Sequence, residues 1–508
     1  MLADTVRQAG RVFGKRSFQI APSGWAMSYE QLNRWSDEVA VGLAQRGVRE
    51  SSVVALVLPT CPEYTVLYAA CAKLGALTAG VNHRLTQVER ERVLTTVQPD
   101  LILSTPELME SKESTELIQP STATSPSLAS PEADQIEAEV LAELRVPDGS
   151  PASLTEDLDR PICIVFTSGT TGTPKGAVFG GRQLQFICHV DTQHMWNSPQ
   201  EPAVDSSAGT SLTHLGPMTK LLGNLHRGGT SHLMKKWTAL GELEATEQFR
   251  MPVIAGIPTQ LALILHHKSF DEFDLSCVQA VIIGGGPATP ALISEARERL
   301  GVPVAVRYAC TEAGIGVGTS FQDPPEDALQ SVGRPHSGVE LTVRSEAGEL
   351  LELGEIGEIA LKSPAVTSGY YNDPDATAAA FCSDGAVRTG DLGHLDESGR
   401  LHLVGRAKEM YIRGGYNVYP MEVEAVLSQH ADVAEVVIVP RLDPIMGEIG
   451  VAVLVPRDPL NPPTLEALRS FAGEQIAPFK LPSELLIRDS LPLTPMEKID
   501  RKAIREEL

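Results

Sequence analysis

Glycines, hydroxyl side chains and one lysine are concentrated in the sequence FTSGTTGTPKGAV, residues 166–178. The stretch follows the apolar run PICIV at 161–165, and an apolar run that leads into Gly, Ser and Thr is typical of a strand ending in a flexible loop. The glycines let the backbone turn with its N–H groups facing inward, the threonines add hydroxyl donors, and Lys175 adds a mobile positive charge. Because clustered donors and a cation offset the desolvation of a polyphosphate, this loop is suited to bind one.

The loop alone does not specify a function. Most loops rich in Gly and Thr are surface turns between strands, and that alternative stays open for an isolated motif. The stretch also departs from the P-loop pattern GxxxxGK[ST]: Pro174 stands where that pattern has its second Gly, and Gly176 stands where it has Ser or Thr. The sequence therefore excludes an ordinary P-loop nucleoside triphosphatase.

The composition describes a large acidic protein. A chain of 508 residues exceeds one ordinary domain, and 42% hydrophobic residues are typical of a folded globule. The formal net charge of -23 argues against nucleic acid or an anionic membrane surface as a partner, although it is compatible with a local basic pocket for ATP. Seven scattered cysteines, none spaced as CxxC, predict reduced thiols in a cytoplasmic protein and no metal site.

We also expect no integral membrane association. Arg7, Arg11, Lys15 and Arg16 interrupt the N-terminal region before any long apolar run, which is not the pattern of a secretory signal. The run VVALVL at 53–58 is far too short to cross a bilayer. These features predict a soluble protein.

The elements that position the loop follow from the apolar periodicity. Helical stretches alternate with short apolar strands from 28 to about 99 and again from 161 to about 320, which predicts an α/β fold with largely parallel sheets. Short strands with turns between 330 and 404 predict a small antiparallel barrel or sheet, and the chain after Arg406 predicts a compact α+β unit. Residues 105–158 include the stretch STATSPSLASPEADQ and are predicted to form an exposed connection.

Five further motifs follow the loop along the chain: IIGGGP at 282–287, YACTEAG at 308–314, RTGDLG at 388–393, GRAKEMYIRGGYNVYPMEVE at 405–424 and LPLTPMEKIDR at 491–501. Together with the loop they resemble the adenylate-forming superfamily, which includes acyl-CoA synthetases, adenylation domains of peptide synthetases and beetle luciferases. The wording is most similar to the acyl-CoA synthetase branch, which includes ligases of fatty and other hydrophobic acids. The similarity spans almost the whole chain.

The resemblance implies a two-domain α/β fold. A large N-terminal AMP-binding domain, residues 1–405, is expected to contain doubly wound sheets and a small β-barrel. A smaller, mobile α+β domain, residues 406–508, is expected to act as a lid on the AMP-binding site.

The resemblance also implies a two-step ligase reaction with ATP, Mg²⁺ and coenzyme A. A small hydrophobic carboxylic acid would attack the α-phosphorus of Mg-ATP to give acyl-AMP and pyrophosphate. The C-terminal domain would then rotate, so that the thiol of CoA attacks the acyl carbonyl. Two alternatives stay open: an enzyme that loads the phosphopantetheine of an acyl carrier protein, and a non-catalytic adenylate-binding relative. Assembly into a homodimer also stays open.

Specific residues match the nucleotide-binding motifs of the superfamily. Lys498 would bridge the substrate carboxylate and the α-phosphate, Thr311 would hydrogen-bond the α-phosphate, and Glu312 would bind Mg²⁺ together with Thr170. A preoriented cation such as Lys498 stabilises the charge that builds up in the transition state. The residues expected to bind ATP and AMP are Thr167, Ser168, Gly169, Thr170, Thr171, Gly172, Lys175, Gly285, Gly286, Pro287, Tyr308, Ala309, Cys310, Thr311, Asp391 and Arg406.

Within that set, Tyr308 would pack on the adenine, Asp391 would accept both ribose hydroxyls, and Arg406 would reach the ribose or a phosphate. Without the family, each of these charged side chains is most simply a solvated surface or turn residue.

The remaining matches concern the acid and the thiol. His214, Trp237 and Gly284 are expected to form the acyl pocket, although a structural His and a core Trp are equally simple interpretations. Lys408 matches the hinge position, and Gly414 and Gly415 match the loop that forms the CoA tunnel.

Overall fold

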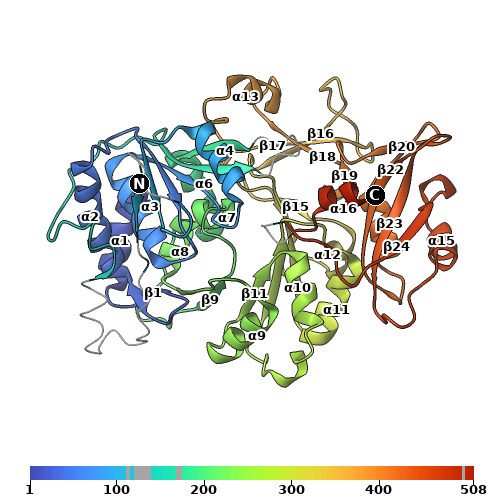
Figure 1. The fold of residues 1–508 in the computed structure, drawn as a ribbon, viewed down its shortest axis with the longest axis horizontal. Helices are drawn as coiled ribbons and strands as arrows, with labels where there is room; N and C mark the ends of the chain where they lie inside the picture. The colour runs from blue at the N-terminus through green and yellow to red at the C-terminus, as the bar shows by residue number, and fades with distance from the viewer. Residues whose placement is uncertain (110–114, 119, 121–138, 168–173, 495–497) are drawn as a thin grey trace.

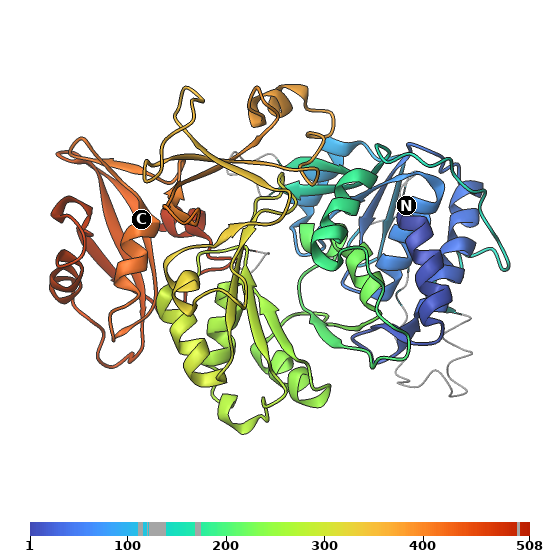
Figure 2. The same cartoon turned by 180° about the vertical axis from the view of Figure 1, so that it is seen from behind.

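The computed structural model describes residues 1–109, 115–118, 120, 139–167, 174–494 and 498–508. Within them the chain forms five β-sheets with helices packed around them, and the C-terminal part lies as a separate lobe beside the rest (Figure 1). The opposite view shows the same arrangement of lobes (Figure 2). The predicted α/β class is confirmed. No helix of the described residues combines the length and the apolar character needed to cross a membrane.

The largest sheet has the strand order β6–β5–β3–β4–β7–β8 and is parallel except for the antiparallel pair β7–β8. On β3, Val54 and Leu56 join a core cluster with α1, α2 and α3, whereas Val53, Ala55 and Val57 join a second cluster with α4. Successive strand side chains point to opposite faces, so helices cover both faces of this sheet. The elements are α1 (Leu2–Phe13), α2 (Tyr29–Gln45), β3 (Val53–Val57), α3 (Pro62–Leu74), β4 (Leu77–Gly80), α4 (Gln87–Val97), β5 (Leu101–Ser104), β6 (Thr115–Leu117), β7 (Pro161–Thr167), β8 (Lys175–Gly180), α6 (Gly181–Thr192), α7 (Leu215–Thr219) and α8 (Leu221–Arg227).

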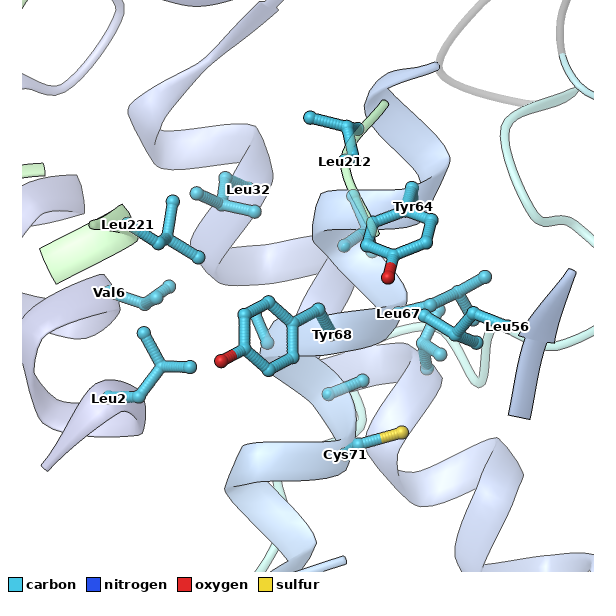
Figure 3. Close-up of a cluster of buried hydrophobic side chains, with 14 of the residues drawn as sticks. Leu2, Val6, Leu32, Leu56, Tyr64, Leu67, Tyr68, Cys71, Leu212 and Leu221 are labelled. Atoms are coloured by element: carbon cyan, nitrogen blue, oxygen red, sulfur yellow. The ribbon is translucent and has the colours of Figure 1, made fainter. Parts of the chain in front are cut away.

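The core beside this sheet sets the position of α7 and of the residue before it, His214. Tyr64 and Tyr68 of α3 lie among leucine and valine side chains from α1, α2 and β3 (Figure 3). The Tyr68 hydroxyl donates a 3.0 Å hydrogen bond to the backbone oxygen of Met218 on α7. Gly80 leaves the room that α7 needs, because a Cβ there would lie 2.8 Å from both Met218 Sδ and Tyr64 Oη.

Two smaller sheets follow. One has the order β11–β12–β13–β14–β15, with β11, β12 and β13 parallel, and the other has the order β2–β1–β10–β9. Gly284 ends β12 and Tyr308 ends β13, so two predicted motifs begin at the same edge of one sheet. The elements are β1 (Ser17–Ile20), β2 (Ala26–Ser28), β9 (Asp205–Ala208), β10 (Thr230–Leu233), α9 (Ala239–Gln248), β11 (Val253–Gly256), α10 (Pro258–Leu265), β12 (Ala280–Gly284), α11 (Pro290–Leu300), β13 (Val304–Tyr308), β14 (Val317–Gly318), α12 (Pro325–Gln330) and β15 (Arg334–Pro335).

An antiparallel sheet of order β16–β17–β18–β19 connects these layers to the C-terminal lobe. A small barrel or sheet is expected from the sequence in this region, and the described strands form a four-stranded sheet in which β16 and β19 are the two edges. The elements are β16 (Glu340–Arg344), β17 (Gly357–Lys362), α13 (Pro374–Ala380), β18 (Val387–Leu395) and β19 (Leu401–Arg406).

The C-terminal lobe is built on the long antiparallel pair β22–β23, with β20, β21 and β24 alongside. Its last helix is held by an ion pair between the half-buried Arg501 and the buried Glu424, in which both terminal nitrogens of Arg501 donate 2.6 Å hydrogen bonds to the carboxylate. The elements are β20 (Tyr411–Arg413), β21 (Tyr416–Val418), α14 (Pro420–Leu427), β22 (Val433–Asp443), β23 (Gly447–Pro456), α15 (Leu465–Gly473), β24 (Glu484–Ile487) and α16 (Arg501–Glu507).

The prediction of an exposed connection at 105–158 is wrong for part of that segment. Thr115–Leu117 forms the edge strand β6, and Val140, Leu141 and Leu144 are buried in the same cluster as α1, α2 and α3. The Ser/Pro/Ala-rich composition concealed these few apolar anchors. Residues 110–114, 119 and 121–138 lie outside the described part of the chain.

Candidate active site

Three predicted AMP-binding residues meet where the ends of β13 and β19 lie beside the middle of β18. Asp391 and Arg406 are paired in register between β18 and β19. One carboxylate oxygen of Asp391 accepts a 2.8 Å hydrogen bond from the Tyr308 hydroxyl, and the other accepts a 3.0 Å hydrogen bond from Arg406 Nε. Asp391 is only 8% exposed, so a buried carboxylate is held at this point by two donors that approach from different strands.

A second group of polar side chains surrounds Tyr370. Its hydroxyl donates a 2.5 Å hydrogen bond to Oε1 of Glu312, and the ammonium of Lys175 lies 5.1 Å from the centre of its ring. The backbone of Glu312 is fixed too, because its carbonyl accepts from the Thr367 amide at 2.8 Å. Two predicted ligands, a carboxylate and a cation, therefore share one tyrosine that the sequence analysis did not single out.

Lys498 approaches the first group from the C-terminal lobe. Its backbone pairs with Thr494, whose amide donates to the Lys498 carbonyl at 2.7 Å, so the chain turns back at this point. The pKa of Lys498 is lowered mainly by burial and further by the positive charge of Arg406, whereas the carboxylate of Asp391 opposes both effects. The ammonium thus lies within electrostatic reach of both Arg406 and Asp391, far from Lys498 in the sequence.

His214 lies near the same centre, at the start of α7. Removal from water lowers its pKa to about 4, and the positive charges of Lys498 and Arg84 and the neighbouring His83 act in the same direction. The ring is therefore neutral near pH 7. His83 and Arg84 follow β4, and the analysis of motifs gave no reason to select either.

In the glycine-rich segment at the end of β12, the backbone packs closely against neighbouring backbone atoms. Gly284 is paired in register with Arg307, and a Cβ on Gly284 would lie 2.6 Å from the Arg307 carbonyl oxygen. Gly285 has φ +77°, a left-handed conformation that favours glycine. Gly286 and Pro287 continue into the Thr289 cap of α11, whose hydroxyl accepts from the Leu292 amide. This segment lies at the same sheet edge as Tyr308, because β12 and β13 are neighbours.

Ala309, Cys310 and Thr311 join the two polar groups, since they connect Tyr308 to Glu312. Burial raises the pKa of the Cys310 thiol well above its usual range, and the charge of Glu312 adds to the effect, so the thiol is neutral. The segment ends at Gly314, which has φ +70°.

The other predicted residues lie elsewhere in the fold, except Lys408, which follows Arg406 by two positions. Trp237 is buried in the core around α10 and α11, and its ring N–H donates to Glu242 at 3.2 Å. Lys408 is exposed in the turn after β19. Gly414 and Gly415, both with positive φ, form the tight turn between β20 and β21 in the C-terminal lobe. Their predicted roles remain predictions.

Part of the phosphate loop cannot be compared with its prediction. Ser168, Gly169, Thr170, Thr171 and Gly172 lie outside the described residues, whereas Thr167 and Lys175, which flank them, are paired between β7 and β8. The predicted strand before the loop is therefore confirmed, and the predicted contacts of the loop itself stay a prediction.

Comparison with known proteins gives the class. Residues 6–371 match the AMP-binding enzyme family, and residues 422–498 match the AMP-binding enzyme C-terminal domain. The chain belongs to the AMP-binding enzyme family, which confirms the resemblance drawn from the motifs.

Three relatives illustrate its range. The chain is 32% identical to indoleacetate–CoA ligase of Aromatoleum aromaticum, over 98% of this chain and 96% of the relative. It is 29% identical to the fatty acid–[acyl-carrier-protein] ligase ScoC of Streptomyces coeruleorubidus, over 95% and 92%. Its fold is similar to that of amide bond synthetase McbA from Marinactinospora thermotolerans, with a TM-score of 0.83, 26% identity and coverage of 100% and 99%. Because these names give different products, family membership alone does not specify the acceptor.

Proposed function

We propose that this chain is an acid–CoA ligase, which activates a hydrophobic carboxylic acid with ATP and then transfers the acyl group to the thiol of CoA. One arrangement carries the proposal: Asp391 is held between Tyr308 and Arg406 by two hydrogen bonds, and the charges of Asp391 and Arg406 act on Lys498 of the C-terminal lobe. An ammonium beside a predicted ribose and phosphate site is suited to stabilise charge on a carboxylate and an α-phosphate at once.

The first half-reaction uses the two polar groups together. Asp391 binds the ribose hydroxyls, since a carboxylate accepts two hydrogen bonds side by side, and Tyr308 holds that carboxylate in place while packing on the adenine. Lys175 and Thr311 bind phosphate oxygens. Lys498 brings the acid carboxylate and the α-phosphorus together, and pyrophosphate leaves.

Glu312 fits a magnesium role. Mg²⁺ is usually held in such sites by one or two carboxylates and by substrate phosphates, and Glu312 lies on the loop between the two polar groups, fixed by Tyr370. The ion would neutralise phosphate charge. The described residues contain no group of three or more His, Cys, Asp or Glu side chains that could hold a metal alone, in agreement with a site completed by the nucleotide.

The second half-reaction needs a different arrangement of the lobes. The Gly414–Gly415 turn joins β20 and β21 of the same lobe as Lys498, and a rotation near Lys408 would exchange Lys498 for this turn. Gating of this kind separates two half-reactions that share one site.

Acid-dependent exchange of pyrophosphate into ATP tests the first step. Indole-3-acetate, ferulate and fatty acids are suitable probes, and Lys498→Ala is the control that should lose exchange. If no acid supports exchange, the non-catalytic alternative is favoured. Mass spectrometry of products formed with CoA or with a holo-acyl carrier protein then distinguishes the two acceptors, and an acyl group found only on the carrier protein would contradict the proposal.

A further inference from the structure

A cavity of about 1050 Å³ lies between the N-terminal part of the chain and the segment that precedes Lys498. Its wall includes the turn between β1 and β2, the end of β10, one face of α9, and Leu493 and Thr494. Ligand pockets usually occupy about 300–1000 Å³, so this one is large enough for a bulky molecule. His214, Trp237 and Gly284, the predicted acyl-pocket residues, are not part of its lining.

The cavity reaches the reaction centre. His83 and Arg84 line it, and both act on the pKa of His214 together with Lys498. Thr494 also lines it and pairs with the backbone of Lys498. A molecule in the cavity can therefore extend to the place where the acid carboxylate meets Lys498.

The residues that the C-terminal lobe contributes to the cavity wall indicate which substrate the cavity binds. Thr494 is hydrogen-bonded to the backbone of Lys498, so Leu493 and Thr494 complete the cavity in the arrangement in which the charge of Asp391 acts on Lys498. In the proposed reaction that arrangement serves adenylation. The occupant is therefore present in the first half-reaction, which points to the acid and not to the thiol.

Most of the cavity wall is apolar, and contacts with neighbouring side chains hold His232 in place in that wall. Gly241 and Ala245, one turn apart on α9, leave room beside the helix. The His232 ring is stacked on Phe249 with 3.7 Å between centroids and pairs with Asp205 at 2.7 Å. Such a surface is suited to the apolar body of an acid.

The mouth of the cavity is positively charged. Lys235 and Lys236 line it and are exposed to solvent, and the positive charge of Lys235 contributes to the lowered pKa of the exposed carboxyl of Glu107. In a chain with a net charge of -23, two adjacent lysines in the lining of one cavity are a local concentration of positive charge that favours an anionic ligand group.

We propose that the acid substrate is a dianion: its reacting carboxylate lies at Lys498, its apolar body fills this cavity, and a second anionic group pairs with Lys235 and Lys236 at the mouth. The inference rests on the proposed function and adds the substrate class.

The experiment compares octanedioate, dodecanedioate and hexadecanedioate with the monocarboxylic acids of the same length. Binding is measured by calorimetry in the presence of a non-hydrolysable ATP analogue, and KM by pyrophosphate exchange. At least one diacid should bind more tightly than its monoacid. In Lys235→Gln/Lys236→Gln the KM for that diacid should rise about tenfold, while KM for the monoacid and for ATP stays unchanged.

Two controls keep the result interpretable. Lys268→Gln removes an exposed lysine away from the cavity lining and should change neither acid. Ala245→Met narrows the cavity and should weaken the longer acids most, whereas Glu244→Met, on the exposed side of α9, should not.

Several outcomes overturn the inference. They are equal binding of diacids and monoacids, no binding of either, an equal effect of the double variant on both acids, or an effect of that variant on KM for CoA alone. Exchange that persists with monoacids in these cases leaves the ligase function intact, so the two proposals fail separately.

Discussion

Tyr370 connects Glu312 and Lys175: its hydroxyl donates to the carboxylate at 2.5 Å, and its ring lies 5.1 Å from the ammonium. Burial raises the pKa of Tyr370 above its usual range, and the charge of Glu312 raises it further. The hydroxyl therefore remains a donor at physiological pH, and one side chain orients both the carboxylate and the cation.

The two contacts of Tyr370 can be separated by substitution. Tyr370→Phe removes the bond to Glu312 but keeps the ring under Lys175, so the Mg²⁺ concentration needed for half-maximal exchange should rise about tenfold, because hydrogen bonds to charged groups are worth about 1.5–3 kcal/mol. Tyr370→Leu also removes the ring and should raise KM for ATP in addition. Identical kinetics of the two variants would contradict this division of roles.

Lys498→Ala should separate the half-reactions. Loss of a preorganised charge-stabilising group typically costs about a hundredfold or more in rate, so pyrophosphate exchange should fall by at least that factor. Thioester formation from chemically prepared acyl-AMP and CoA should stay within a few fold of the unaltered protein, because in the proposed reaction Lys498 has left the site before this step. A parallel loss of both activities would show that Lys498 acts on folding or on both steps.

The pH profile of exchange reports the environment of Lys498. Burial and Arg406 lower its pKa, so the ammonium loses its proton below the value of about 10.4 found for an ordinary lysine. The rate should therefore decline on the alkaline side before that pH. Lys498→Arg, slower but always charged, should shift the decline upward; an unchanged profile in this variant would assign the alkaline limb to another group.

His214 should make the protein less stable in mild acid. Its folded pKa of about 4 lies below the ordinary value of about 6.5, so the stability contribution is complete above about 6.5 and is lost as the pH falls towards 4. Urea midpoints at pH 7 and pH 5 measure this loss. His214→Gln should reduce the difference between the two midpoints, whereas His189→Gln, an exposed histidine, should leave it unchanged. Because the pKa of His83 is also lowered to about 4, mainly by burial, part of the difference should persist.

We expect Arg501 to help position Lys498, the proposed catalytic lysine. It is held by two hydrogen bonds to Glu424 and one to the Ile438 carbonyl, and it begins α16 three residues after Lys498. Arg501→Lys keeps the charge but not the paired geometry, so exchange should fall about tenfold with only a small change in the melting temperature. Lys502→Ala, at a position with an 82% exposed side chain, is the matched control and should have no effect. Equal effects of the two substitutions would exclude this positioning role.

The periodicity of apolar residues was sufficient to predict the helices and strands in which these residues follow a regular pattern. A helix follows Ser28, and the runs at 53–57 and 161–167 are strands, as their apolar patterns predict. The segment at 105–158 was misjudged because a few apolar anchors, such as Leu141, lie within a polar, Ser/Pro-rich composition that gives them no periodicity.

The site residues also fall into those that the sequence could predict and those that it could not. Asp391, Tyr308 and Arg406 could be selected because they belong to ordered motifs, and the structure brings them together. Tyr370 and His83 could not be selected from the sequence, because tertiary packing brings each of them to the centre. Tyr370 is 58 positions from Glu312 in the sequence. His83 follows Gly80, against which α7 packs, and it acts on His214 at the start of that helix. A single tyrosine or histidine between strands carries no such information by itself.

The C-terminal lobe contributes Leu493 and Thr494 to the cavity wall, in addition to Lys498, the proposed catalytic lysine. Chimeras that exchange this lobe between relatives would consequently inherit two traits at once, the activating cation and part of the preference for particular acids. Exchange of the C-terminal lobe should therefore also change which acids the protein prefers.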